Sequence, residues 1–159
     1  MKVIKYTLTP NNFKPEKEFK LKFIPYHMKT AILYSHLSSA KRLKCSSVLV
    51  TPDNTRLLMI GYNGTLPGSD NECEILLDNK LITKPDVIHA EANVILYCAK
   101  YGINTNGCNL YITHSPCLEC SKMILASGIK RVFFNEKYRK EDGVLLLKKY
   151  NLDVIQIQF

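Results

Sequence analysis

From residue 109 onward, short apolar segments alternate with longer amphipathic ones, and this alternation leaves few possible folds. The segments run in the order NLYIT, CLECSKMILAS, KRVFF, EDGVLLLKKY and LDVIQIQF. The first, third and fifth have the length and side chains of strands, and the two between them have helical spacing. A helix that connects two strands of one sheet is a crossover, which makes those strands parallel. The sequence therefore predicts an α/β domain with parallel strands covered by helices.

The first half of the chain adds two helices, a hairpin and a loop. We predict a helix over residues 26–44, where apolar side chains recur near helical spacing. Residues 46–62 hold two apolar segments joined by a Pro-Asp-Asn turn and predict a β-hairpin. The stretch 61–74 is rich in Gly, Asn, Asp and Pro, which predicts a long loop. A second helical pattern runs over 88–100 and stops at Gly102.

Length and composition fit one compact domain. The chain has 159 residues, of which 46% are hydrophobic, and this suffices for a full core. We assign residues 26–159 to a single domain and residues 1–25 to a basic N-terminal arm packed on it. The sequence contains no apolar run of about 18 residues and no signal peptide at its start. We therefore expect a cytoplasmic protein without a membrane partner.

The net charge of +8 is concentrated near the N-terminus and suggests an anionic partner. Residues 1–29 carry seven lysines and two glutamates, whereas residues 30–159 carry 15 basic and 12 acidic side chains. Two interpretations of the basic arm stay open. It is either a solvated or packed edge of the domain, or a contact for nucleic acid.

Four side chains predict a metal site with a proton-transfer group beside it. Cys117 and Cys120 form a Cys-x-x-Cys pair directly after Pro116, at the first turn of a predicted helix, where the helix dipole favours thiolates. His89 opens the preceding helix and provides a third ligand. Three protein ligands and one open position are typical of catalytic zinc. Glu91 lies close enough to exchange protons with a zinc-bound water.

The order His-x-Glu followed by Pro-Cys-x-x-Cys is the signature of zinc-dependent nucleobase deaminases. With the flanking segments, the chain resembles the deoxycytidylate (dCMP) deaminase family in its short phage and bacterial form. The similar segments are GYNGTLPG, HAEANVIL, THSPCLECSKMI and GIKRVFFNEKY. The resemblance implies a cytidine-deaminase-like, three-layer α/β/α fold with a five-stranded mixed sheet flanked by helices. It also implies conversion of dCMP to dUMP and ammonia, by attack of zinc-activated hydroxide on cytosine C4 with Glu91 as proton shuttle.

The resemblance assigns four further residues to the substrate pocket. Asn63 matches a position where an amide holds the sugar hydroxyl, and Asn93 and Ser115 match positions that line the nucleotide pocket. Tyr138 matches a tyrosine close to the bound nucleotide. Each also has a structural explanation. Asn63 could be a turn residue, and Asn93 could support the loop above its helix. Ser115 could be the helix N-cap before Pro116, and Tyr138 could be an ordinary core or rim aromatic.

Regulation and assembly follow from the resemblance alone. The family implies dCTP and dTTP as effectors, with Mg²⁺ accompanying dCTP, and homo-oligomers that are hexamers or smaller. The first strand is entered here by KCSSVLV in place of the Val-Gly-Ala-Val type found in many members, which puts the regulation in doubt. Arg42 and Lys44 are either contacts for an effector phosphate or solvated cations at the end of a helix.

The remaining cysteines do not complete a second metal site in the sequence. Some relatives hold a structural zinc with a histidine two residues before His-Ala-Glu, and this chain has Val87 there. Cys73 resembles a surviving part of that site. We therefore predict one Zn²⁺, with Cys98 and Cys108 as small buried hydrophobic residues.

Two other classes of function remain as alternatives. One is a deaminase that acts on a base within RNA or single-stranded DNA, with the basic arm as the contact, although the arm lacks arginines. The other is a protein that uses zinc only for folding, in which Glu91 would have no proton to move.

Overall fold

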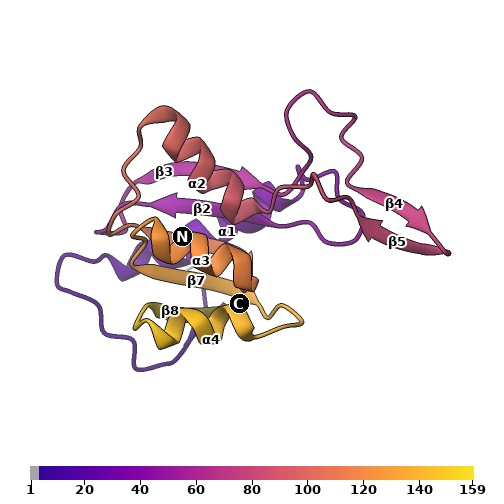
Figure 1. The fold of residues 1–159 in the computed structure, drawn as a ribbon. Coiled ribbons are helices and arrows are strands. Elements are labelled where there is room, and N and C mark those ends of the chain that lie inside the picture. Colours follow the sequence, from indigo (N-terminus) through magenta and orange to yellow (C-terminus); the bar gives the residue numbers. More distant parts are fainter. Residues whose placement is uncertain (1–3) are drawn as a thin grey trace.

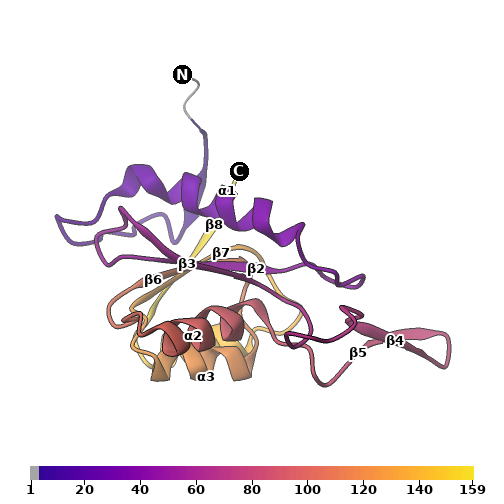
Figure 2. The same ribbon diagram turned by 90° about the horizontal axis from the view of Figure 1, so that it is seen from above.

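A computed structural model describes residues 4–159 and shows one mixed sheet between two layers of helices (Figure 1). The sheet has six strands in the order β1-β8-β7-β6-β2-β3. Their bounds are β1 Thr7–Thr9, β2 Ser46–Val50, β3 Leu57–Tyr62, β6 Asn109–His114, β7 Arg131–Glu136 and β8 Asp153–Gln158. The helices are η1 Leu21–Phe23, α1 Ile24–Ser35, α2 Ala90–Tyr101, α3 Leu118–Ala126 and α4 Asp142–Lys149. Figure 2 shows α1 on one face of the sheet and α2 and α3 on the other.

The strand directions confirm the prediction for the second half of the chain. β6, β7 and β8 are parallel neighbours, and α3 and α4 are the crossovers between them. The predicted hairpin is also present, because β2 pairs antiparallel with β3. β2 runs antiparallel to β6, so the sheet is mixed. The five expected strands are thus present as β2, β3, β6, β7 and β8. β1 adds a sixth by pairing antiparallel with β8.

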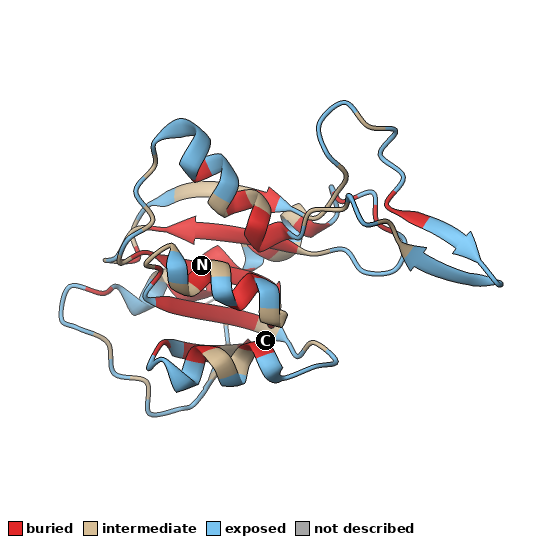
Figure 3. Cartoon of the chain, viewed as in Figure 1, coloured by how far each residue is buried: buried red, intermediate tan, exposed pale blue. Residues whose placement is uncertain are grey.

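Apolar side chains on both faces of the sheet form two separate cores, and Figure 3 shows the central strands as the most buried part. On one face, Leu110 and Ile112 pack with side chains from α2, α3 and α4. On the other face, Tyr111 and Phe133 pack against α1. Alternate residues of β6 thus enter opposite cores, as the two-residue period of a strand requires. Cys98 and Cys108 are buried in the first core, which confirms the prediction for them.

The predicted helix over 26–44 is too long, since α1 ends at Ser35. The residues that follow form a loop whose backbone is satisfied by a distant side chain. The buried Glu74 carboxylate accepts hydrogen bonds from the backbone N–H groups of Lys41 and Arg42 at 3.0–3.1 Å. This contact joins positions more than 30 residues apart, so helical periodicity alone cannot reveal it.

A second hairpin, absent from our prediction, projects from the body after the Gly-rich loop (Figure 1). It consists of β4 Glu74–Leu77 and β5 Lys80–Thr83 in a two-stranded sheet. Its turn residues Asp78 and Asn79 both have positive φ, which Asp and Asn tolerate and which suits a two-residue hairpin turn. All five apolar side chains of its two strands are exposed, namely Ile75, Leu76, Leu77, Leu81 and Ile82.

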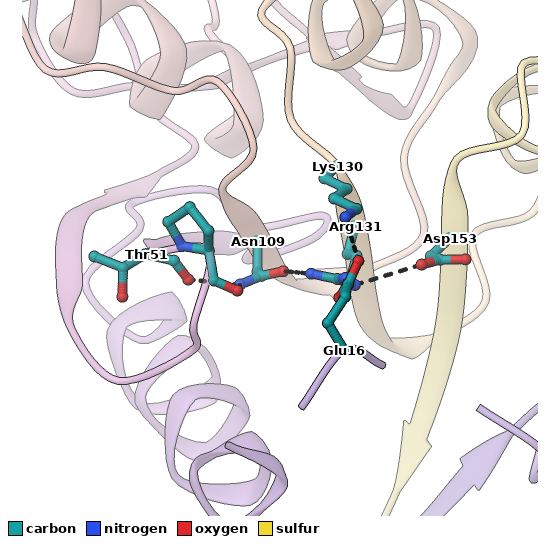
Figure 4. Close-up of polar contacts among 7 residues, drawn as sticks. Glu16, Thr51, Asn109, Lys130, Arg131 and Asp153 are labelled. Atoms are coloured by element: carbon teal, nitrogen blue, oxygen red, sulfur yellow. Dashed lines mark hydrogen bonds and ion pairs between the residues drawn. The ribbon is translucent and has the colours of Figure 1, made fainter. Parts of the chain in front are cut away.

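The N-terminal segment contacts the sheet beyond β1. Phe19 is buried and stacks on Phe133 with ring centroids 6.1 Å apart. Glu16 forms ion pairs with Lys130 and with Arg131, which is almost fully buried (Figure 4). Residues 1–3 of the predicted arm lie outside the described part of the chain, and the boundary after residue 25 stays a prediction. Within residues 4–159, we find no helix with the length and hydrophobicity of a membrane span.

Candidate active site

The predicted metal-binding side chains meet where two helices begin beside the carboxyl ends of parallel strands. His89 is the N-cap residue of α2, and Cys117 is the N-cap residue of α3. Cys120 lies in the first turn of α3. Both helices therefore direct their unpaired N–H groups and positive dipole ends toward the same point.

The three donor atoms are close enough to share one metal ion. Nδ1 of His89 lies 3.5 Å from Sγ of Cys117 and 3.4 Å from Sγ of Cys120. One ligand atom from each residue falls within 4.8 Å of the others. One imidazole and two thiols suit zinc, and a set of three leaves a position open for water or substrate. The residues present therefore fit a catalytic zinc ion.

The electrostatics of the donors also suit a cation. A hydrogen bond with Cys120, together with one from His89, lowers the pKa of Cys117 to about 3, even though burial opposes this shift. The hydrogen bond to Cys117 raises the pKa of His89. The contact with Cys117, followed by burial, raises the pKa of Cys120, so Cys117 is the cysteine that loses its proton more readily. A metal ion would displace the remaining thiol proton.

Glu91 is buried next to this cluster, with only 7% of its surface exposed. Burial raises the pKa of its carboxyl group, which makes the protonated form more accessible near neutral pH. Its position two residues after His89, in the first turn of α2, keeps the carboxyl beside the donors without making it part of the predicted ligand set. A carboxyl group with a raised pKa in a cavity can both accept and return a proton.

Close packing of α4 fixes the turn that carries Cys117. A Cβ atom added to Gly143 would come within 2.7 Å of Ser121 Oγ and 2.8 Å of the Cys117 carbonyl carbon, and would also meet the Pro116 carbonyl oxygen. Only glycine allows the first turn of α4 to approach this closely. The packing of α4 thus sets the position of a metal ligand.

A cavity of about 420 Å³ has Glu91 and two of the three donors, His89 and Cys117, in its wall. Its cationic side chains are Arg42, Lys137 and Arg139. Arg42 donates a hydrogen bond from Nη1 to Thr83 Oγ1 at 2.9 Å, which links it to the β4–β5 hairpin. A cavity of this volume with several cations on its wall suits a small anionic ligand.

Three of the four predicted pocket residues line this cavity, namely Asn63, Ser115 and Tyr138. The Asn63 amide is engaged with the backbone, because Oδ1 accepts from Cys45 N at 2.7 Å and Nδ2 donates to Leu43 O at 2.9 Å. Ser115 Oγ accepts a hydrogen bond from the Tyr138 N–H at 2.8 Å, which joins the two predicted residues.

Asn93 lies apart from the other predicted residues. It is on α2, and its amide donates to the Tyr62 carbonyl oxygen at 2.9 Å. It is not among the residues that line the cavity. In this structure the Asn93 amide ties α2 to the last residue of β3.

Sequence reasoning missed several cavity residues. Glu74 and Thr83 reach the cavity through the unpredicted hairpin, and His114 and Glu136 reach it from the last positions of β6 and β7. His114 and Glu136 could have been recognised from the sequence, because each lies at the C-terminal end of a strand, and the two strands were predicted to be parallel neighbours. Side chains at such strand ends meet at one edge of the sheet.

The sequence model of the cytidine and deoxycytidylate deaminase zinc-binding region matches residues 22–136, which include all four predicted metal and proton-transfer residues. The chain belongs to the cytidine and deoxycytidylate deaminase family. Within this family, the deoxycytidylate deaminase of Enterobacteria phage T2 is 47% identical, over 70% of this chain and 80% of the phage protein. The human deoxycytidylate deaminase is 35% identical, over 77% of this chain and 70% of the human protein. The ComE operon protein 2 of Bacillus subtilis is 36% identical over 72% of this chain, which spans 59% of that protein.

Solved structures agree with the family assignment. The dCMP deaminase of cyanophage S-TIM5, crystallised with dCMP and dUMP, superimposes with a TM-score of 0.79 at 38% identity. The match covers 87% of this chain and 98% of the cyanophage chain. A tRNA:A34 deaminase gives a TM-score of 0.56 at 22% identity, which shows a shared fold only. The chain thus has the cytidine-deaminase-like fold that the resemblance implied.

Proposed function

We propose that this protein is a zinc-dependent enzyme that hydrolyses dCMP to dUMP and ammonia. The observation that carries the proposal is the buried Glu91 beside the cluster of His89, Cys117 and Cys120, next to a cavity that has three cationic side chains in its wall. The cyanophage enzyme of the same fold was crystallised with dCMP and dUMP, the proposed substrate and product.

The three donors would hold the zinc ion through Nδ1 of His89 and the two sulfur atoms. When bound, zinc supplies a nucleophile at neutral pH, because it lowers the pKa of a coordinated water from 15.7 to about 7. Glu91 would take a proton from the attacking water, whose oxygen bonds to C4, and deliver that proton to N3 of cytosine. Glu91 would then take the proton of the hydroxyl group now bound to C4 and pass it to the amino group, which leaves as ammonia while C4 becomes a carbonyl carbon. Its raised pKa suits both directions of transfer.

The cations of the cavity support a nucleotide as substrate. Arg42, Lys137 and Arg139 lie on its wall, and each can contact a phosphate oxygen. Lys137 also pairs with Glu141 at 3.3 Å, whereas Arg42 and Arg139 form no ion pair with a carboxylate within residues 4–159, so a nucleoside without phosphate would leave these two arginines without an anionic partner. We infer that the 5′-phosphate of dCMP binds among them, while Asn63, Ser115 and Tyr138 shape the part of the pocket nearer the metal.

Steady-state turnover of a substrate panel tests the proposed function. The panel holds dCMP, CMP, deoxycytidine, a tRNA and single-stranded DNA, each with zinc-loaded protein. We expect the highest kcat/KM for dCMP. Turnover of tRNA or single-stranded DNA with none of dCMP would overturn the proposal.

The nucleic-acid alternative has less support from the N-terminal segment. Bases of single strands stack on accessible aromatic side chains. Phe19 is buried, and Phe13 packs edge-on against Phe133 with ring centroids 5.7 Å apart. These two aromatic rings belong to the core and are not available for stacking.

Several expectations remain predictions. They are regulation by dCTP and dTTP, Mg²⁺ bound with dCTP, assembly into a hexamer or a smaller homo-oligomer, and location in the cytoplasm. Kinetics with each effector, with and without Mg²⁺, would test the first two. Analytical ultracentrifugation would test the third, and cell fractionation the fourth.

A further inference from the structure

A second cysteine–histidine pair lies in the same cavity as the proposed catalytic zinc site. Cys45 directly precedes β2, and His114 is the last residue of β6. Sγ of Cys45 lies 3.6 Å from Nδ1 of His114. Both residues line the cavity, and neither belongs to the predicted ligand set.

The separation of these two atoms fits coordination of one metal ion. Zinc bonds of about 2.3 Å to sulfur and about 2.0–2.1 Å to nitrogen, at a tetrahedral angle, place the two ligand atoms about 3.6 Å apart. The corresponding distances at the first site are 3.5 Å to Cys117 and 3.4 Å to Cys120. The second pair therefore needs little movement to bind a cation.

A carboxylate orients the second histidine as it would in a metal site. Oε2 of Glu136 lies 3.3 Å from Nε2 of His114, on the side of the ring away from Cys45. The two residues are register partners at the ends of β6 and β7, so the sheet itself sets this contact. Histidines that bind metals usually donate their other ring N–H to such a carboxylate, so that the facing nitrogen can act as a ligand. In His114 this nitrogen also lies 3.3 Å from Thr113 Oγ1, a contact that a metal ion would replace.

We propose that Cys45 and His114 form a second binding site for a thiophilic divalent cation. Zn²⁺ is the cation with which the proposal can be tested. On binding, the Cys45 thiol releases its proton to solvent, a metal–sulfur and a metal–nitrogen bond form, and water fills the remaining positions. Burial, followed by the charge of Glu91, raises the pKa of Cys45 to about 12. With two protein ligands in place of three and a thiol that must lose its proton, this site binds zinc more weakly than the first.

The position of the second site also predicts an effect on turnover, and this part rests on the proposed function. An ion held by Cys45 and His114 occupies space in the 420 Å³ cavity that contains Glu91. Substrate and the second ion then exclude each other. We expect excess Zn²⁺ to raise the KM for dCMP.

Equilibrium dialysis with metal analysis tests the site without any turnover. Protein loaded with one zinc per chain is dialysed against rising Zn²⁺. We expect the wild type to approach two zinc ions per chain, and Cys45→Ser and His114→Gln each to stay at one. Cys73→Ser is the matched control, because Cys73 also lines the cavity but has Ser39, and not a histidine, as its sulfur partner at 3.3 Å. It should retain both ions.

A measurement on the wild type covers the case in which a variant fails to fold. Alkylation of Cys45 by a small reagent, followed by mass spectrometry, should slow when Zn²⁺ is in excess. A wild type that stays at one zinc, a second zinc retained by both folded variants, or an unchanged alkylation rate would each overturn the site. Two ions per chain without dCMP turnover would instead overturn the proposed function and leave this site standing.

Discussion

Glu91 is the residue on which the proposed chemistry depends most directly. It is buried beside the metal donors, and proton transfer requires its carboxyl group. We predict that Glu91→Gln lowers kcat for dCMP by about 10²–10⁴-fold, because glutamine cannot carry the proton. Steady-state kinetics measure the loss, and metal analysis should show that zinc is retained.

Glu119→Gln provides the control for this change. Glu119 lies between the two cysteines of the motif, but it is 73% exposed and pairs with Lys122. Its replacement should leave kcat within twofold of the wild type. Equal turnover in wild type and Glu91→Gln would favour a purely structural zinc site.

Arg42 provides a residue-level test of phosphate binding. We predict that Arg42→Ala raises the KM for dCMP by about 5–30-fold, which corresponds to the loss of about 1–2 kcal/mol from a charge-assisted hydrogen bond. The KM for deoxycytidine, which has no phosphate, should not change. Arg56→Ala, an exposed arginine just before β3, is the control and should leave both values unchanged. An equal effect of Arg42→Ala on both substrates would argue against a phosphate contact.

Residue identities near the metal could be predicted because the chemistry requires particular side chains at fixed spacing. To predict the roles of these residues, it was enough to know their order in the sequence and to expect two helices that begin side by side. The residues are His89, Glu91, Cys117 and Cys120. The contact between Cys45 and His114 could not be predicted in this way. The two positions are 69 residues apart, Cys45 just before β2 and His114 at the end of β6, and the pairing register of these two strands is known only from the structure.

Among the secondary-structure elements, α4 controls the metal site through one glycine. We predict that Gly143→Ala lowers the free energy of unfolding by about 1–3 kcal/mol, the usual cost of overpacking a tight contact. It should also weaken zinc binding, because the added methyl group displaces the turn at Cys117. Urea denaturation and competition with a zinc chelator measure the two effects.

Gly64→Ala separates crowding from a general effect of replacing glycine. Gly64 lies near the cavity in the Gly-rich segment, and an added Cβ atom there has no neighbour within 4 Å. Its replacement should therefore change neither stability nor zinc affinity by a comparable amount. If the two variants behave alike, the close approach of α4 does not position the ligand.

Prediction of elements succeeded where local pattern and packing agree. The alternation after residue 109 was read correctly because each helix has one apolar face and each strand is short and buried. The extension of α1 to residue 44 was wrong, because Glu74 from a distant hairpin satisfies the loop backbone. The β4–β5 hairpin was missed because its apolar side chains are exposed and therefore show no burial pattern.

At the scale of the whole molecule, the pairing of Glu16 with Lys130 and Arg131 links the N-terminal segment to the sheet. A hydrogen bond with Lys130, then one with the backbone, and the charge of Arg131 lower the pKa of Glu16 to about 2 from its usual value of 4.5. A lowered pKa in the folded state stabilises the protein above pH 4.5. That stabilisation is lost as the pH falls from 4.5 to about 2.

We therefore predict that acid unfolding of the wild type steepens between pH 4.5 and 2. Glu16→Gln should flatten this part of the stability curve, measured by urea denaturation at each pH. Glu18→Gln is the control, since Glu18 lies in the same segment and forms no ion pair within residues 4–159. Identical pH curves for the wild type and Glu16→Gln would contradict the role assigned to this contact.

The architecture as a whole was predictable down to its five central strands, whereas the sixth was not. β1 has three residues, a length too short for a periodic pattern, and it pairs with β8 from the opposite end of the chain. The burial of Arg131 was equally unpredictable. In the sequence, KRVFF suggests an arginine at a solvated strand end, whereas in the structure Arg131 contacts Glu16, Asn109 and Asp153 (Figure 4).

The projecting β4–β5 hairpin pairs with no third strand in the described chain, so it can open at a low free-energy cost. Its amide hydrogens should exchange with deuterium before those of β6 and β7, which lie inside the sheet. Glu74 and Thr83 on this hairpin also line the cavity, so a bound nucleotide should slow their exchange. Deuterium uptake by the β4–β5 hairpin would then report whether a nucleotide fills the cavity. The strands that support the metal ligands should exchange only on global unfolding.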